Sequence, residues 1–229
     1  MCRRLPLFVL APVALLAAGA ALVVAAPFGT SGQPVTMKQL MSVLPRGKDV
    51  PGYRAVFQRP ETGIGPSPEH HCGRVESALW SPDRMPVAST RVVLSSTRGG
   101  QERHVVDSYS YAEDDAEVIM DELRASIPAC AHYNSYFADL YLRFGTKPAE
   151  PPFAVGDEMV GYRVLAPPEG HVDLAGSGVP LGPGPLREPG ASTTFVRTGG
   201  VITRYRLPVP QDIPEGFHER FRRAPDAED

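Results

Sequence analysis

The chain lacks any motif that assigns it to an enzyme class. No Gly-x-Ser-x-Gly nucleophile elbow is present, and no glycine-rich stretch leads into a helix with a phosphate-binding lysine. The acidic pairs Asp114-Asp115 and Asp121-Glu122 fit a capped, solvated helix face better than an acid–base pair. We therefore expect a protein without catalytic activity, metal or cofactor. An exported enzyme with an unrecognised active site stays open as the alternative.

A strong charge of either sign is also lacking. The chain carries 23 Lys and Arg against 26 Asp and Glu, a formal net charge of −3, and the two signs are mixed along the sequence. Nucleic-acid binding requires a basic patch or stripe, and the sequence offers none. We therefore expect no nucleic-acid partner.

The one long uncharged stretch lies at the N-terminus. Leu5 to Phe28 contain no charged side chain, and Arg3 and Arg4 precede them. This pattern places the N-terminus in the cytoplasm and the rest of the chain in an extracytoplasmic space. Val24-Ala25-Ala26 offers small residues for signal cleavage, whereas Pro27 and the length of the run favour a retained helix. A single-pass membrane anchor over residues 5–28 and a secreted protein both stay open.

The remaining sequence predicts one extracytoplasmic domain. After a signal sequence or anchor over 1–28, we expect a linker over 29–35, the domain over 36–209, and a C-terminal helix with a charged tail over 210–229. Capping patterns predict helices that begin at Thr36 and Asp114 and end near Pro45 and Pro128. Alternation of apolar and polar residues predicts strands at 91–96, 104–111, 140–144, 159–166, 192–197 and 201–207. The expected fold class is α+β: an antiparallel sheet of about five to seven strands with helices packed on one face, after an N-terminal hydrophobic helix.

Two cysteines remain in the exported region, Cys72 and Cys130. An even count in an oxidising compartment predicts a disulfide between them. A link between positions this far apart would stabilise the fold by about 4 kcal/mol on the chain-entropy model. A zinc site that also used His71 and His132 is the weaker alternative, because neither half has a familiar zinc-finger spacing. Free thiols are the third possibility.

Aromatic residues gather around the second predicted helix and are the candidate ligand-binding residues. They are Tyr109, Tyr111, Tyr133, Tyr136 and Phe137. Their ring faces and hydroxyl groups could line a cleft for an apolar or carbohydrate ligand. The alternative is that they close the core between sheet and helix.

Several segments together resemble a known family. They are Leu40 to Leu44, Pro51-Gly52-Tyr53, Cys72, Val105 to Ala112, and Asp114 to Cys130 with its Ile127-Pro128-Ala129-Cys130 ending. In this order they resemble the extracellular sensor domain of actinobacterial serine/threonine kinases of the PknH type, which also occurs in secreted and membrane-anchored proteins. That family commonly has a second disulfide, for which this exported region has no cysteines.

The resemblance implies a sensor-like or ligand-binding module without catalysis, with an antiparallel sheet, helices on one face and a cleft for an unidentified ligand. The partner would be a small molecule or a component of the cell envelope. An envelope module that binds proteins through its sheet edges is a further alternative.

Overall fold

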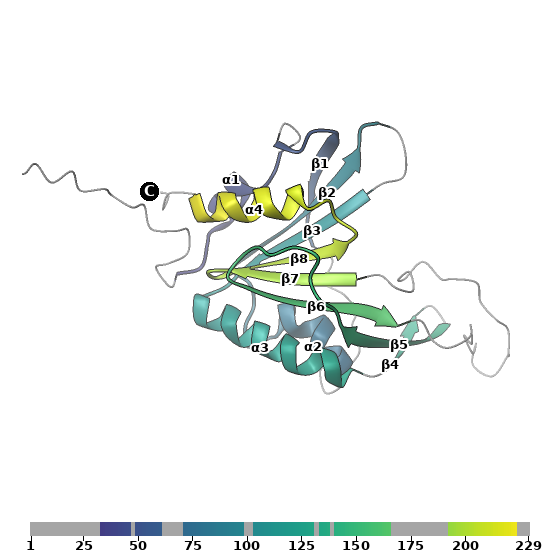
Figure 1. The fold of residues 1–229 in the computed structure, drawn as a ribbon. Helices are drawn as coiled ribbons and strands as arrows, with labels where there is room; N and C mark the ends of the chain where they lie inside the picture. Colours follow the sequence, from purple (N-terminus) through teal and green to yellow (C-terminus); the bar gives the residue numbers. More distant parts are fainter. Residues whose placement is uncertain are drawn as a thin grey trace, which may run out of the picture.

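The fold is an eight-stranded antiparallel sheet with helices against both faces (Figure 1). It comes from a computed structural model that describes residues 33–46, 49–60, 71–98, 103–130, 133–137, 140–165 and 192–223. The strands are β1 (Tyr53–Gln58), β2 (Ala88–Ser96), β3 (Arg103–Ser110), β4 (Tyr133–Phe137), β5 (Leu140–Pro148), β6 (Glu158–Leu165), β7 (Ser192–Thr198) and β8 (Val201–Leu207). They lie side by side in the order β1-β2-β3-β8-β7-β6-β5-β4. The helices are α1 (Met37–Val43), α2 (His71–Ser77), the 3₁₀ turn η2 (Ala78–Trp80), α3 (Glu113–Ala129) and α4 (Asp212–Arg223).

The expected α+β class is confirmed, but the strand count is higher than expected. The alternation of residues did not identify β1 or β4, which are the two edges of the sheet. Four of the six residues in β1 are exposed, among them Val56 and Phe57. Because an edge strand is only partly buried, its sequence lacks a clear alternation of apolar and polar residues.

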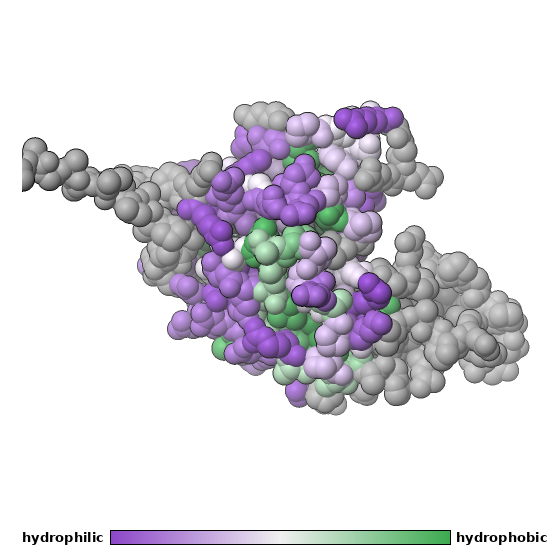
Figure 2. Space-filling model, in the orientation of Figure 1, coloured by the Kyte–Doolittle hydropathy of each residue, from purple (hydrophilic) through white to green (hydrophobic). Residues whose placement is uncertain are grey.

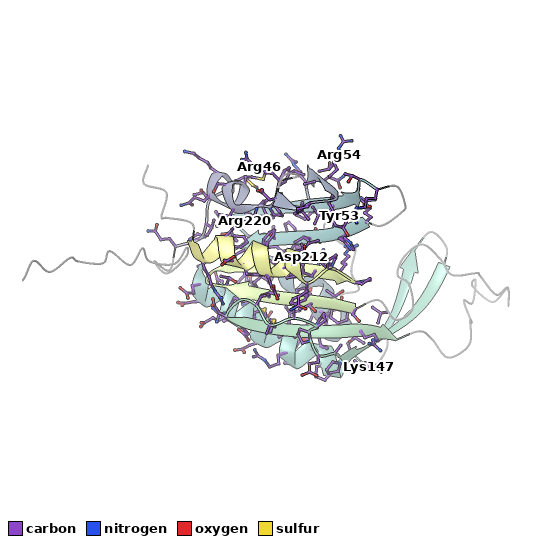
Figure 3. The ribbon with its side chains drawn as sticks, turned by 45° about the horizontal axis from the view of Figure 1, so that its top comes forward. Arg46, Tyr53, Arg54, Lys147, Asp212 and Arg220 are labelled. Atoms are coloured by element: carbon purple, nitrogen blue, oxygen red, sulfur yellow. The ribbon has the colours of Figure 1, made fainter. Side chains whose placement is uncertain are left out.

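The expectation that the helices share one face of the sheet is wrong. Successive side chains on a strand point to opposite faces. On β8, Val201 and Tyr205 pack in a cluster with α1 and α4, whereas Ile202 packs in a second cluster with α3 and η2. The sheet therefore lies between two helical layers, α1 with α4 and α2 with α3 (Figures 1 and 3). Capping signals locate a helix along the chain but carry no information about which face it covers.

The two helix starts behave differently from each other. At α1 the predicted capping box is present: the amide of Gln39 donates to the Thr36 hydroxyl, and the Gln39 side chain accepts from the Thr36 amide. At α3 the N-cap is Ala112, not Asp114, and its side chain makes no capping bond. Asp114 instead lies in an acidic first turn, where it complements the helix dipole.

The predicted N-terminal hydrophobic helix lies outside the described residues, as does most of the linker. Within the described ranges, no helix is both long enough and apolar enough to span a bilayer. The membrane anchor over residues 5–28 stays a prediction.

Candidate ligand-binding cleft

A concavity of about 630 Å³ lies over the ends of β5, β6 and β7. We call it the strand cleft. It is lined by Lys147, Pro148, Ala149, Glu150, Pro152, Arg163, Ser192, Thr193, Thr194, Pro208 and Val209. Lys147 lies well apart from the α4 residues Asp212 and Arg220 (Figure 3).

One wall of the strand cleft forms because the chain after β5 turns back over the sheet. The amide of Ala149 donates to the carbonyl oxygen of Gly161 on β6, with 2.9 Å between N and O. A Cβ atom at Gly161 would lie 2.5 Å from the Ala149 oxygen, so the crossing requires glycine at this position. Further along, Phe153 is buried and packs edge-on against Tyr205, with ring centroids 5.5 Å apart. These contacts hold the 149–153 segment as a fixed wall.

The charged side chains of the strand cleft come from neighbouring strands. Lys147 on β5 pairs in register with Arg163 on β6, which in turn pairs with Ser192 on β7. Side chains at paired positions project from the same face, so the two cations are direct neighbours. Both are exposed, and neither has an ion-pair partner among the described residues. Glu150 is the one carboxylate among the lining residues, which leaves an excess of positive charge.

The face in view in Figure 2 is mostly hydrophilic, with a narrower apolar band between the regions of α3 and α4. No broad apolar surface is seen on this face. On this face of the molecule, an ionic or polar site is therefore a better candidate for ligand binding than an apolar groove.

The five aromatic residues predicted to bind ligand do not form one group. Tyr109 and Tyr111 are 0% and 1% exposed, and each is held by a hydrogen bond. The Tyr111 hydroxyl donates to the Leu79 carbonyl oxygen at 2.7 Å, so this side chain anchors η2 in the core. Burial, the largest effect, raises the pKa of Tyr109 to about 12 together with the charge of Asp107 and against the lowering effect of Arg204. Both tyrosines are core residues and not a ligand surface.

Tyr133, Tyr136 and Phe137 lie on β4, whose side chains are outside the described part of the structure. The topology nevertheless separates them from the other two residues. Five inter-strand steps of about 4.8 Å each put roughly 24 Å between the backbones of β3 and β4. A ligand role for the three β4 residues stays a prediction, as a group distinct from Tyr109 and Tyr111.

Of the two predicted disulfide cysteines, Cys130 caps the C-terminus of α3 and is 1% exposed. The side chain of Cys72 lies outside the described residues, but its helix, α2, packs against α3. The pairing stays a prediction. His132 is also outside the described residues, and no group of three or more potential metal ligands occurs within them.

A carboxylate with two arginines lies buried within the sheet. Asp107 on β3 accepts from Arg91 Nε at 2.6 Å and from Arg204 Nη2 at 2.6 Å, and Arg204 also donates to the Tyr109 hydroxyl at 3.2 Å. We call these four residues the Asp107 cluster. Burial alone would raise the pKa of Asp107, but the two guanidinium groups outweigh it and lower that pKa below 3.8. The cluster binds three strands together and is closed to solvent.

A histidine is bonded to two hydroxyl groups on the α4 side of the sheet. His218 lies 2.7 Å from the Thr198 hydroxyl through Nδ1 and 3.0 Å from the Tyr205 hydroxyl through Nε2. Burial, with a smaller effect of Arg222, lowers the pKa of His218 to about 3. At neutral pH the ring is uncharged, and with 1% exposure no substrate can reach it. Its role is to fasten α4 to β7 and β8.

Sequence patterns did not identify Lys147 and Arg163 as candidate ligand-binding residues. The predicted strand ended at residue 144, whereas β5 continues to Pro148. The two side chains are 16 positions apart, and only the register of β5 on β6 makes them neighbours. No pattern within either strand predicts the register of β5 on β6.

Among solved structures, the fold is similar to the extracellular domain of PknH from Mycobacterium tuberculosis, with 10% sequence identity and a TM-score of 0.46. The likeness covers 83% of this chain and 96% of that chain. No protein-family model matches the chain, and no curated protein matches it. Membership of the sensor-domain family therefore stays a prediction.

Proposed function

We propose that this chain is an extracytoplasmic ligand-binding module without catalytic activity, and that it holds an anionic group in the strand cleft. The observation that carries the proposal is the direct pairing of Lys147 with Arg163, two exposed cations without an ion-pair partner in the described structure. The ligand would be a small molecule or an envelope component that bears a phosphate or carboxylate group.

Like charges at directly opposite strand positions destabilise a sheet. A bound anion reverses the sign of that interaction, because both cations then donate charge-assisted hydrogen bonds to it. The guanidinium group of Arg163 can bind two oxygens of a phosphate or carboxylate at once, and Lys147 adds a mobile point charge. Ser192 and Thr194, which line the same cleft, offer hydroxyl groups for the remaining oxygens.

A binding role fits the lining of the cleft better than a catalytic one. Nucleophilic catalysis by a hydroxyl group needs a base within hydrogen-bond reach. The described lining residues include neither histidine nor cysteine, and no hydrogen bond joins Glu150 to a cleft hydroxyl. The extracytoplasmic location rests on Arg3-Arg4 and the uncharged run that follows them.

The test is isothermal titration of the full-length protein, in detergent where it is retained in a membrane, with inorganic phosphate and with vesicles of phosphatidylglycerol. We expect binding that weakens with added salt and falls by about tenfold or more in a Lys147→Ala–Arg163→Ala variant. Binding of phosphate alone would indicate a soluble ligand, and binding of the vesicles alone a lipid headgroup.

Arg54→Ala is the matched control, because Arg54 is an exposed arginine on β1, at the opposite edge of the sheet from β4. It should bind as the wild type does. Equal affinity in the double variant and the wild type would refute the proposal.

A further inference from the structure

A second concavity, of about 560 Å³, lies between α3 and the segment that runs from α2 through η2 into the following turn. We call it the helix cavity. Its lining residues are Arg74, Ser77, Ala78, Trp80, Ser81, Pro82, Asp83, Arg84, Glu122, Ala125 and Ser126. The volume lies in the range of about 300–1,000 Å³ that is typical of small-molecule sites. No residue of the strand cleft takes part in it.

The walls of the helix cavity are fixed by contacts beneath and across it. Beneath it, the Tyr111 hydroxyl holds the backbone of η2 at Leu79, and α2 packs against α3. In the turn, the amide of Arg84 donates to the Ser81 carbonyl oxygen at 3.0 Å. Across the cavity, Arg84 forms an ion pair with Glu122 of α3. A ligand would therefore meet a preformed site and would order little of the chain on binding.

The charges in the helix cavity balance, in contrast to those of the strand cleft. The lining of the helix cavity has two cations, Arg74 and Arg84, and two carboxylates, Asp83 and Glu122. Such a lining offers both donors and acceptors and has no preference for a ligand of either sign. The hydroxyl groups of Ser77, Ser81 and Ser126 add further polar contacts. This chemistry suits an uncharged ligand with several hydroxyl groups.

Two features indicate where such a ligand would bind. Trp80 is partly buried, with one part of its indole edge-on to Tyr109 at 5.4 Å between centroids, and it also lines the cavity. An indole offers an apolar ring face to a sugar ring. The Nε–H of Arg84 is buried and has no acceptor among the described residues. A buried donor without an acceptor is destabilising by about 1–3 kcal/mol, and a ligand oxygen would satisfy it.

We propose that the helix cavity binds a neutral saccharide of one or two sugar rings, with Trp80 against a ring and Arg84, Asp83 and Glu122 hydrogen-bonded to its oxygens. This is a site additional to the strand cleft, and either site can exist without the other.

The test uses the fluorescence of Trp80, which is the only tryptophan in the chain. The full-length protein is titrated with glucose, N-acetylglucosamine, maltose and N,N′-diacetylchitobiose. At least one of these probes should change the emission saturably, and the affinity should not depend on salt, since the ligand is uncharged. Asp83→Ala should weaken that affinity about tenfold. The matched control is Asp114→Ala, which removes an exposed carboxylate in the first turn of α3 and should leave the affinity for the sugar unchanged.

The Lys147→Ala–Arg163→Ala variant separates the two sites, because it should weaken phosphate binding by about tenfold or more and leave the saccharide response intact. The inference is overturned if none of the four sugars gives a saturable change up to ~10 mM, a concentration far above useful affinity. It is also overturned if Asp83→Ala and Asp114→Ala bind the sugar as well as the wild type does, since the ligand then lies elsewhere.

Discussion

The buried histidine on α4 makes the stability of the domain sensitive to mild acid. In the folded protein the ring of His218 is enclosed by Phe217, Phe221 and Tyr205, and its pKa is lowered from 6.5 to about 3. In the unfolded chain the same ring takes up a proton near pH 6.5. Below that pH the unfolded state binds more protons than the folded state, so the free energy of unfolding falls as the pH falls.

The size of the effect follows from the gap between the pH and the unfolded pKa. Each pH unit below 6.5 removes about 1.4 kcal/mol until the pH approaches the folded pKa. At pH 5 the loss is therefore about 2 kcal/mol relative to pH 7, a large fraction of the ~5–15 kcal/mol that holds a typical domain together. Asp107 does not contribute in this window, because its pKa lies below 3.8 when folded and it is ionised in both states.

The assay is urea denaturation of the wild type and of His218→Gln at pH 7 and at pH 5. Glutamine keeps a polar group beside Thr198 and Tyr205 but has no proton to gain. Other titrating groups are the same in both proteins, so the stability difference between them should shrink by about 2 kcal/mol from pH 7 to pH 5. A difference that stays the same at both pH values would refute the reasoning. Should His218→Gln fail to fold, proton NMR of the wild-type ring gives the answer, because it should not titrate between pH 8 and pH 5.

Three further outcomes are expected. Asp107→Ala leaves two buried arginines without their carboxylate and should lower the free energy of unfolding by about 3–5 kcal/mol in urea titration, whereas retention of wild-type stability would show that the cluster is not needed. Lys147→Glu places an opposite charge across from Arg163, so thermal unfolding should show a gain of about 0.2–1 kcal/mol while calorimetry shows loss of phosphate binding. If Cys72 and Cys130 are joined, a Cys72→Ser–Cys130→Ser variant should lose about 2–5 kcal/mol, and mass spectrometry after alkylation without reduction should find neither thiol modified in the wild type.

Local signals in the sequence predicted those parts of the fold that local interactions determine. The α1 capping box depends on residues three positions apart, Thr36 and Gln39, and it is present. The hairpin of β2 and β3 and that of β7 and β8 join strands that follow one another closely, and both are present. In each case the residues whose pattern predicts the helix start or hairpin also form its hydrogen bonds with one another.

Long-range pairings could not be predicted in this way. β3 lies beside β8, so Asp107 meets Arg204 across 97 positions of sequence. That pairing places β3, which carries Tyr109, in the interior of the sheet and leaves β4 at its edge. The aromatic residues predicted to line one cleft are therefore divided between the interior and the edge of the sheet. The same long-range pairing decides which polar residues are buried and which are available to a ligand.

The two ends of β6 carry charged residues with different partners. An ion pair lies at one end, and a pair of like charges, for which we propose a ligand, lies at the other. At its start, Glu158 is paired in register with Arg197, and the Arg197 Nε lies 3.1 Å from the carboxylate. At its other end, Arg163 is paired in register with Lys147, and the described structure supplies no carboxylate to either. A sheet shaped by stability alone would favour opposite charges at both ends. A single Lys147→Glu change would provide them, and an anion bound between Lys147 and Arg163, as we propose, would relieve the same repulsion.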